Sequence, residues 1–183
     1  AGRSTLLLLT GATVLGGIIG PLLILLGLKI TSSGSVALWL NLEFVATVML
    51  GHLVFHEHLA PRGWIAAGGT LMAAVLLAGG EGGGGFLAVI LIAFGCLCWG
   101  LDNHFTALID GISPSQTTLW KGIVAGAFNL VMAGALTGGL GRSAMILIAL
   151  LVGAVSYGLS ITLYVTAAQR LGATRSQMVF SAA

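Results

Sequence analysis

Six apolar segments follow one another along the chain, separated by short stretches of small and polar residues. Their predicted bounds are residues 5–28, 33–55, 63–79, 86–108, 115–137 and 144–169. Because about 20 residues of helix cross the hydrocarbon core of a bilayer, each segment is predicted to be a transmembrane helix. A seventh segment begins near Thr174 and is too short to cross before the sequence ends at Ala183. The pattern predicts an all-α membrane protein, a polytopic bundle of transmembrane helices.

Composition agrees with a membrane environment. Charged residues make up 7% of the chain and apolar residues 57%, with a mean hydropathy of +1.09, whereas roughly 25% of residues are charged in soluble domains. The net charge of +2 is spread over several loops and forms no basic patch, so we expect no nucleic-acid partner. The opening "AGRST" has no initiator methionine, and with the short seventh segment it suggests part of a longer protein.

The positions of Lys and Arg predict an orientation. If the segments alternate in direction, four of these residues lie on one side of the membrane and two on the other, and the richer side is normally cytoplasmic. The predicted cytoplasmic residues are Arg3, Arg62, Arg170 and Arg175, and the predicted external residues are Lys29 and Arg142.

A weak internal repeat relates the two ends of the chain. The stretch "VLGGIIGPLLILLGLKITSSGS" aligns with "VSYGLSITLYVTAAQRLGATRS", and each contains an apolar span, a basic residue and a small polar turn before a new span. Transporter folds often contain such repeats. The spacing makes the repeat five spans long, and an odd number of spans inverts its topology. We expect the later part of a first repeat in residues 1–80, a glycine-rich linker in residues 81–85 and the earlier part of a second repeat in residues 86–183.

Two stretches carry a resemblance to a known family. The first, "NLEFVATVMLGHLVFHEHLAPRGWIAAGGTLMAAVLLA", resembles the end of the first half of an EamA-type transporter of the drug/metabolite transporter superfamily, and "FGCLCWGLDNHFTALIDGISPSQTTLWKGIVAG" resembles the start of its second half. The resemblance implies two inverted five-helix repeats, of which the chain would contain helices three to eight and the start of nine. It also implies a secondary carrier that exports small metabolites or drugs by alternating access in a bacterial inner (plasma) membrane. Phe44 stands where the family commonly has proline, which leaves open whether the helix breaks near Glu43.

Glu43 lies at the centre of the second segment. A carboxylate at that depth costs on the order of 3 kcal/mol on insertion scales, so it should face the bundle interior or a wet cavity. Its segment carries a matching stripe at a spacing of four residues, Ser35, Trp39, Glu43, Thr47 and Gly51, which lies on one helix face. We predict that Glu43 faces a central cavity, where it binds a cationic or zwitterionic solute or carries a proton. A protonated glutamate with only a structural role is the alternative.

Two charges in neighbouring segments predict an ion pair. Asp102 lies six residues before the end of one segment and Lys121 six residues after the start of the next, so at a rise of 1.5 Å per residue both lie roughly 9 Å inside the same side. Antiparallel neighbours would bring them level, and pairing lowers the cost of two separate membrane charges. The alternative is that Lys121 extends to the cytoplasmic interface.

Other polar and aromatic residues lie on the same helix faces. Trp99 shares a face with Asp102, Asn129 shares one with Lys121, and Tyr164 shares one with two serines of the sixth segment. For the aromatic residues, packing within the bundle is the alternative. The predicted substrate or proton pathway consists of Glu43, Trp39, Trp99, Asp102, Asn103, Lys121, Asn129 and Tyr164.

Glycine pairs at the G-x-x-x-G spacing predict close helix approach. These pairs are Gly16/Gly20, Gly122/Gly126 and Gly134/Gly138. Pro21, directly after Gly20, also predicts a kink in the first segment because proline cannot donate a backbone hydrogen bond to the preceding turn.

Three histidines near the end of the second segment resemble a zinc-binding cluster in their spacing. His52 and His56 are one helical turn apart and His58 follows, but the H-E-x-x-H pattern of zinc enzymes is absent. We expect no metal, no cofactor and no catalytic residue. A carrier is preferred, and a membrane-embedded enzyme that uses Glu43, Asp102 or these histidines is the alternative. The expected partners are a small-molecule solute and the lipid bilayer, with a homodimer left open.

Overall fold

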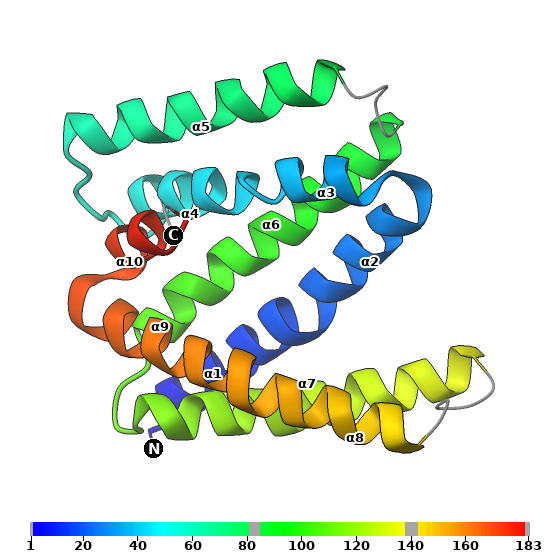
Figure 1. Ribbon diagram of the computed structural model, residues 1–183. Helices are drawn as coiled ribbons and strands as arrows, with labels where there is room; N and C mark the ends of the chain where they lie inside the picture. Colours follow the sequence, from blue (N-terminus) through cyan, green and yellow to red (C-terminus); the bar gives the residue numbers. More distant parts are fainter. Residues whose placement is uncertain (1, 81–84, 138–142, 182–183) are drawn as a thin grey trace.

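The computed structural model describes residues 2–80, 85–137 and 143–181, and the regular elements of this part of the chain are all helices (Figure 1). Each predicted segment end lies within two residues of a helical end, and the predicted all-α bundle is confirmed. The elements are α1 (Arg3–Ala12), η1 (Thr13–Ile19), α2 (Gly20–Ile30), α3 (Ser33–Trp39), α4 (Leu42–Leu53), α5 (Pro61–Gly80), α6 (Phe86–Ala107), α7 (Pro114–Thr137), α8 (Ser143–Val152), η2 (Gly153–Tyr157), α9 (Gly158–Leu171) and α10 (Ala173–Phe180).

Five helical stretches of the described chain are long and apolar enough to cross a membrane. The first joins α1, η1 and α2, the second joins α3 and α4, and the last joins most of α8 with η2 and α9. α5 coincides with the third predicted segment but is not among the five, so the prediction of six complete spans is confirmed for five. The five stretches are Arg3–Ile30, Ser33–Leu53, Phe86–Ala107, Pro114–Leu136 and Met145–Leu171.

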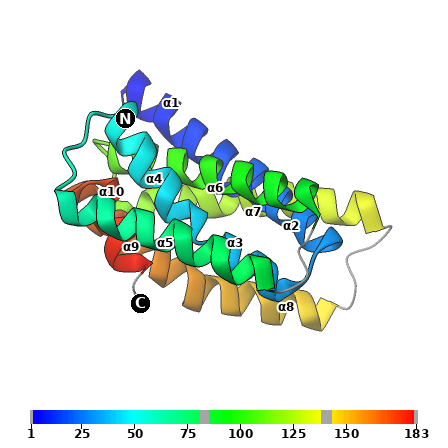
Figure 2. The same cartoon turned by 90° about the horizontal axis from the view of Figure 1, so that it is seen from above.

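The helices run back and forth between two ends of the bundle (Figures 1 and 2). The chain starts at the left end in Figure 1, and the α4–α5, α6–α7 and α9–α10 connections return to that end, whereas the α2–α3 turn lies at the opposite end. We name the left end the basic end, because Arg3, Arg62, Arg170 and Arg175 lie in helical turns next to it. The alternation on which the predicted orientation depends is therefore present.

α6 lies at the centre of the bundle, in contact with α1, α2, α4, α9 and α10 (Figure 1). The sides of the outer helices that face away from it are apolar and exposed, most completely in α8, as expected for surfaces in contact with lipid. Buried side chains form one cluster around α6, made of Ile24, Val36, Ile92 and Cys96, and a second between α4 and α5, made of Phe44, Val48 and Ala67.

The first span changes from α to π geometry at η1, directly before the Gly20–Pro21 step. Pro21 has no N–H with which to bond the carbonyl of Gly17. The N–H of Gly20 bonds the carbonyl of Leu15, so the carbonyl of Gly16 also loses its usual α-helical donor. The disturbance predicted at Pro21 takes the form of this π-helical segment, and two backbone carbonyls become free to accept bonds from other helices.

The second span is interrupted between α3 and α4, just before Glu43. The N–H of Glu43 bonds the carbonyl of Leu40. The carbonyl oxygen of Trp39 instead lies 3.7 Å from the thiol of Cys96. The break that the sequence left open is thus present without a proline. Glu43 consequently lies in the first turn of α4, where backbone dipoles favour a negative charge.

Candidate functional site

Three helices form a polar cluster around Glu43. Asn103 of α6 donates from Nδ2 to Glu43 Oε1 and to Thr47 Oγ1, at 3.1 Å in both cases. Gln177 of α10 donates from Nε2 to the same Glu43 Oε1 at 3.1 Å. Within the described residues, Glu43 forms no ion pair and its Oε2 accepts no hydrogen bond. Neutral amides therefore hold the carboxyl group by Oε1, whereas Oε2 has no partner within the described part of the chain.

Glu43 lines a cavity of about 170 Å³ between α3, α4 and α10. Its wall combines the polar ends of Glu43 and Gln177 with aromatic rings. The carboxyl group therefore reaches a small polar cavity, while the predicted central position between two repeats and a role in binding stay predictions. The cavity is lined by Ala37, Leu40, Asn41, Glu43, Phe44, Gln177, Phe180 and Ser181.

The predicted ion pair between Asp102 and Lys121 is confirmed. Lys121 Nζ lies 2.5 Å from Asp102 Oδ1. Thr106 Oγ1 donates to the same oxygen at 2.9 Å and accepts from Lys121 Nζ at 3.3 Å. The two charged side chains are only 14% and 15% exposed, so the alternative of a lysine extended to the interface is wrong. Asp102 packs directly on the backbone of Gly16, where an added Cβ would overlap its carboxyl group.

Two further predicted residues bind the carbonyls that η1 leaves free. Trp99 Nε1 donates to the carbonyl of Gly16 at 3.0 Å. Asn129 Nδ2 donates to the carbonyl of Gly17 at 2.8 Å. These bonds join α6 and α7 to the first span. Neither side chain lines the Glu43 cavity, and a pathway role for them stays a prediction.

The last two predicted aromatic residues differ in their relation to the cavity. Trp39 packs against the buried cluster around α6 and does not line the cavity. Tyr164 of α9 packs edge to face on Phe180, with ring centroids 5.3 Å apart, and Phe180 lines the cavity. The hydroxyl group of Tyr164 is buried without a hydrogen-bond partner among the described residues. Tyr164 therefore lies behind the cavity wall, whereas packing is the role observed for Trp39.

Gln177 is the site residue that the sequence did not single out. It belongs to the short last segment, where Thr174, Gln177 and Ser181 recur at helical spacing and would have indicated a polar face. A continuation of the same reasoning to this segment would have found it. Gln177 supplies one of the two donors to Glu43.

A second group missed from the sequence lies at the basic end. The ring of His104 is 1% exposed, and its Nδ1 lies 3.4 Å from Glu57 Oε1. Hydrogen bonding to His104 is the main cause that lowers the pKa of Glu57 to about 2, and partial burial opposes it. Glu57 lies in the histidine-rich turn after α4, whereas His104 lies in α6, and no spacing rule connects residues so far apart.

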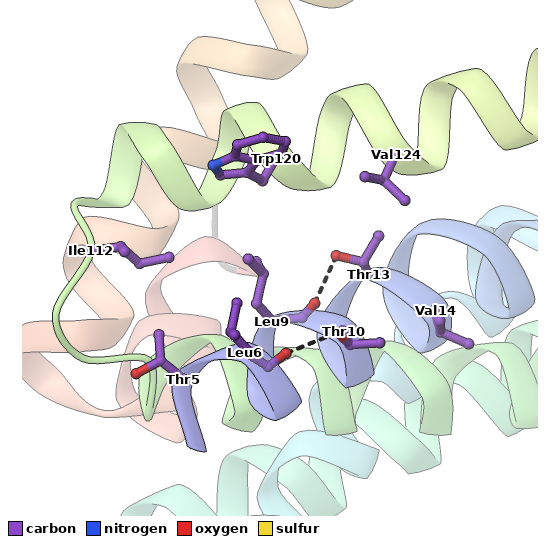
Figure 3. Close-up of a pocket in the computed structure, with 9 residues that line it drawn as sticks. All are labelled: Thr5, Leu6, Leu9, Thr10, Thr13, Val14, Ile112, Trp120 and Val124. Atoms are coloured by element: carbon purple, nitrogen blue, oxygen red, sulfur yellow. Dashed lines mark hydrogen bonds between the residues drawn. The ribbon is translucent and has the colours of Figure 1, made fainter. Parts of the chain in front are cut away.

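A larger cavity of about 360 Å³ lies elsewhere, between α1 and α7 (Figure 3). Leu9 of α1 and Val14 of η1 line it together with Trp120 and Val124 of α7, and its lining is almost wholly apolar. It contains none of the predicted pathway residues. We therefore take the smaller cavity as the candidate site, because only that one brings a carboxyl group and an amide together.

The histidines next to α4 do not form a metal site in the described part of the chain. His52 packs edge to face on Trp64, with ring centroids 5.1 Å apart. No group of three His, Cys, Asp or Glu side chains among the described residues is placed to hold a metal ion.

The helices of membrane length contain a carboxyl group held by two carboxamides and a buried ion pair, polar groups of the kind that mark solute pathways in membranes. Residues 2–79 match the EamA-like transporter family. This match spans α1 to the last turn of α5 and confirms the predicted resemblance to an EamA-type transporter. Comparison with curated proteins and with solved structures gives no match. The EamA-type match and the apolar helices together indicate an integral membrane protein of the transporter class.

Proposed function

We propose that the protein is a secondary carrier that exports small metabolites or drugs by alternating access, with the Glu43 cluster as the site for the solute or a coupling proton. The observation that carries this proposal is the bonding of Glu43: its Oε1 accepts from two neutral amides, and among the described residues no Lys, Arg or His lines its cavity. A buried carboxyl group that lacks a cationic partner is costly in a membrane and is most often functional. A solute amine or a proton would supply the missing positive charge.

The position of the cluster supports the proposal. Glu43 follows the interruption between α3 and α4, and transporter sites are commonly formed by such discontinuous helices. Gln177 reaches Glu43 from α10, which the proposed repeat assigns to the second half of the protein. On this proposal, residues 1–80 and 86–183 belong to two inverted repeats joined by residues 81–85, and the site lies between them. The proposed location is a bacterial inner membrane with Arg62 and Arg170 in the cytoplasm.

The charge of the solute follows from Glu43 Oε2, which accepts no hydrogen bond from the described residues. An ammonium group would pair with this oxygen, whereas an anionic solute would be repelled. Phe44 and Phe180 line the cavity and would contact the apolar part of a solute. We therefore propose cationic or zwitterionic solutes for this transporter.

Transport by the full-length protein in proteoliposomes tests the proposal. Choline, leucine and mannitol serve as cationic, zwitterionic and neutral probes, each measured with and without a pH gradient. Glu43→Gln is expected to reduce transport of choline or leucine at least about tenfold, because one lost charged contact changes binding by that order. Asp110→Asn, which alters an exposed carboxyl group in a loop, is the control and should transport normally. Unchanged rates for Glu43→Gln under both conditions would contradict the proposal.

A further inference from the structure

Glu57 connects three parts of the molecule at the basic end. It lies in the turn between α4 and α5, and its Oε1 is 3.4 Å from Nδ1 of His104 on α6. Its Oε2 accepts from the backbone N–H of Thr174, at the start of α10, at 3.2 Å. A carboxylate at a helix N-terminus is favourable because it meets unpaired N–H groups and the positive end of the helix dipole.

The ring of His104 is held between two acceptors. Its Nδ1 faces Glu57 Oε1 and its Nε2 lies 2.9 Å from the carbonyl oxygen of Thr47. A neutral imidazole has one N–H and can serve only one of them, whereas the doubly protonated ring donates to both. Phe55 stacks on the ring with centroids 4.3 Å apart and planes 11° apart. The ring of His104 therefore links the Glu57 carboxyl group to the backbone of α4 at Thr47.

Close packing fixes the start of α10 on the same group. A Cβ added at Gly51 would lie 3.1 Å from the ring of His104 and closer still to Thr174 Oγ1, so α4, α6 and α10 meet here with no room for a larger residue. The turn at Gly172 has a φ of +88° and lies directly against the Glu57 carboxyl group. The first turn of α10 is therefore positioned by Glu57 and His104.

One helical turn along α10 lies Gln177, the donor to Glu43. We propose that Glu57 and His104 are positioning residues for the Glu43 site: their ion pair fixes the start of α10 and thereby keeps Gln177 bonded to Glu43. This inference rests on the proposed function insofar as it concerns transport. The placement of α10 itself does not depend on it. Release of the ion pair would free α10 and open the wall of the Glu43 cavity.

The test measures the position of α10 directly in the full-length protein. Ser176 is 3% exposed, and Ser176→Cys, on a background of Cys96→Ala and Cys98→Ala, reports opening of α10 by its rate of reaction with a maleimide. The rate is divided by the rate in SDS at the same pH, which removes the titration of the thiol itself. Glu57→Ala should increase the normalised rate about tenfold or more, because it removes bonds to a charged group. Glu57→Gln retains an acceptor for Thr174 and should have an intermediate effect.

A comparison of variants separates positioning from a general loss of structure. His104→Gln removes the ring that faces Glu57 and should also increase the normalised rate, and in the double variant with Glu57→Ala the logarithm of the rate should rise by less than the sum of the two single effects. His52→Gln, in the last turn of α4 and packed on Trp64, is the control and should behave like the parent. Equal labelling of Glu57→Ala and its parent, or fully additive effects of Glu57→Ala and His104→Gln, would overturn the proposal.

Transport measured on the same variants separates this inference from the proposed function. If Glu57→Ala speeds labelling and Glu43→Gln abolishes transport, both hold. Faster labelling with normal transport in Glu43→Gln would retain the positioning of α10 and remove the transport site. Lost transport in Glu43→Gln with unchanged labelling in Glu57→Ala would do the opposite.

Discussion

Gly16→Ala should break the buried ion pair between Asp102 of α6 and Lys121 of α7. Gly16 itself lies in η1, on a different helical segment that packs against Asp102. The new methyl group would lie 2.7 Å from Cβ of Asp102 and closer to its carboxyl carbon, whereas ordinary contacts begin at 3.4 Å. Asp102 must therefore retreat by at least 3.4 − 2.7 = 0.7 Å. Its bond of 2.5 Å to Lys121 does not survive such a shift in a packed interior. We expect a loss of about 3 kcal/mol in the free energy of unfolding, the lower end of the cost of breaking a buried pair.

Unfolding in mixed micelles, followed by circular dichroism as SDS is added, measures this loss in the full-length protein. Gly122→Ala is the matched control: Gly122 is the residue after Lys121, and an added Cβ there meets nothing within 4 Å. Alanine favours helix over glycine by up to about 1 kcal/mol, so the control should be neutral or slightly more stable. Equal stability of the two variants would show that Asp102 does not pack on Gly16, and would refute the reasoning.

Three further outcomes are expected. Trp99→Phe replaces the indole with a smaller aromatic ring and removes the donor to the carbonyl of Gly16, and should lower the free energy of unfolding by about 1–3 kcal/mol in the same assay. Asp102→Asn and Lys121→Met should each destabilise the protein, and the double variant should lose at least about 1 kcal/mol less than the sum of the two; additivity would argue against a coupled pair. The pKa of Glu57 is lowered to about 2 from 4.5, so its contribution to stability is present above pH 4.5 and is lost as the pH falls toward 2. This acid loss should be smaller in Glu57→Gln, and an identical pH profile would contradict it.

The bilayer explains why the helices could be predicted so closely. A span must be apolar over a fixed length, so the hydropathy pattern alone placed both ends of each of the six predicted segments within two residues of a helical end. The same depth argument predicted the pairing of Asp102 with Lys121, because two charges at equal depth in neighbouring helices lower their cost by meeting. Physical constraints imposed by the membrane are local in sequence, and sequence patterns report them directly.

Contacts between helices that are far apart in the sequence were harder to predict. The G-x-x-x-G pattern correctly predicted close approach at Gly16 and Gly20, but the same prediction was wrong at Gly122 and Gly126, where an added Cβ would meet nothing within 4 Å. Such a pattern describes a flat helix face and does not say which helix, if any, covers it. The predicted pair Gly134/Gly138 extends beyond the described residues.

The site shows the same limit. Glu43 and Asn103 were predicted because each is polar within a span. Gln177 was missed because its segment was treated as too short to contribute. The bonds of His104 to Glu57 and Thr47 depend on how α4, α6 and the turn after α4 pack, which no local sequence pattern encodes.

The central claim is that the transported solute occupies the Glu43 cavity. The most direct test is whether the solute protects a cysteine in that cavity from chemical labelling. Ser181 is exposed and lines this cavity, so Ser181→Cys in the full-length protein, without Cys96 and Cys98, should react readily with a maleimide. Whichever of choline, leucine or mannitol the parent protein transports should slow this reaction in proportion to its occupancy, and Glu43→Gln should remove the protection. Ser115→Cys, exposed on α7 and away from the cavity, should react at the same rate with and without the solute. Labelling of Ser181→Cys that a transported solute leaves unchanged would contradict a pathway through the Glu43 cavity.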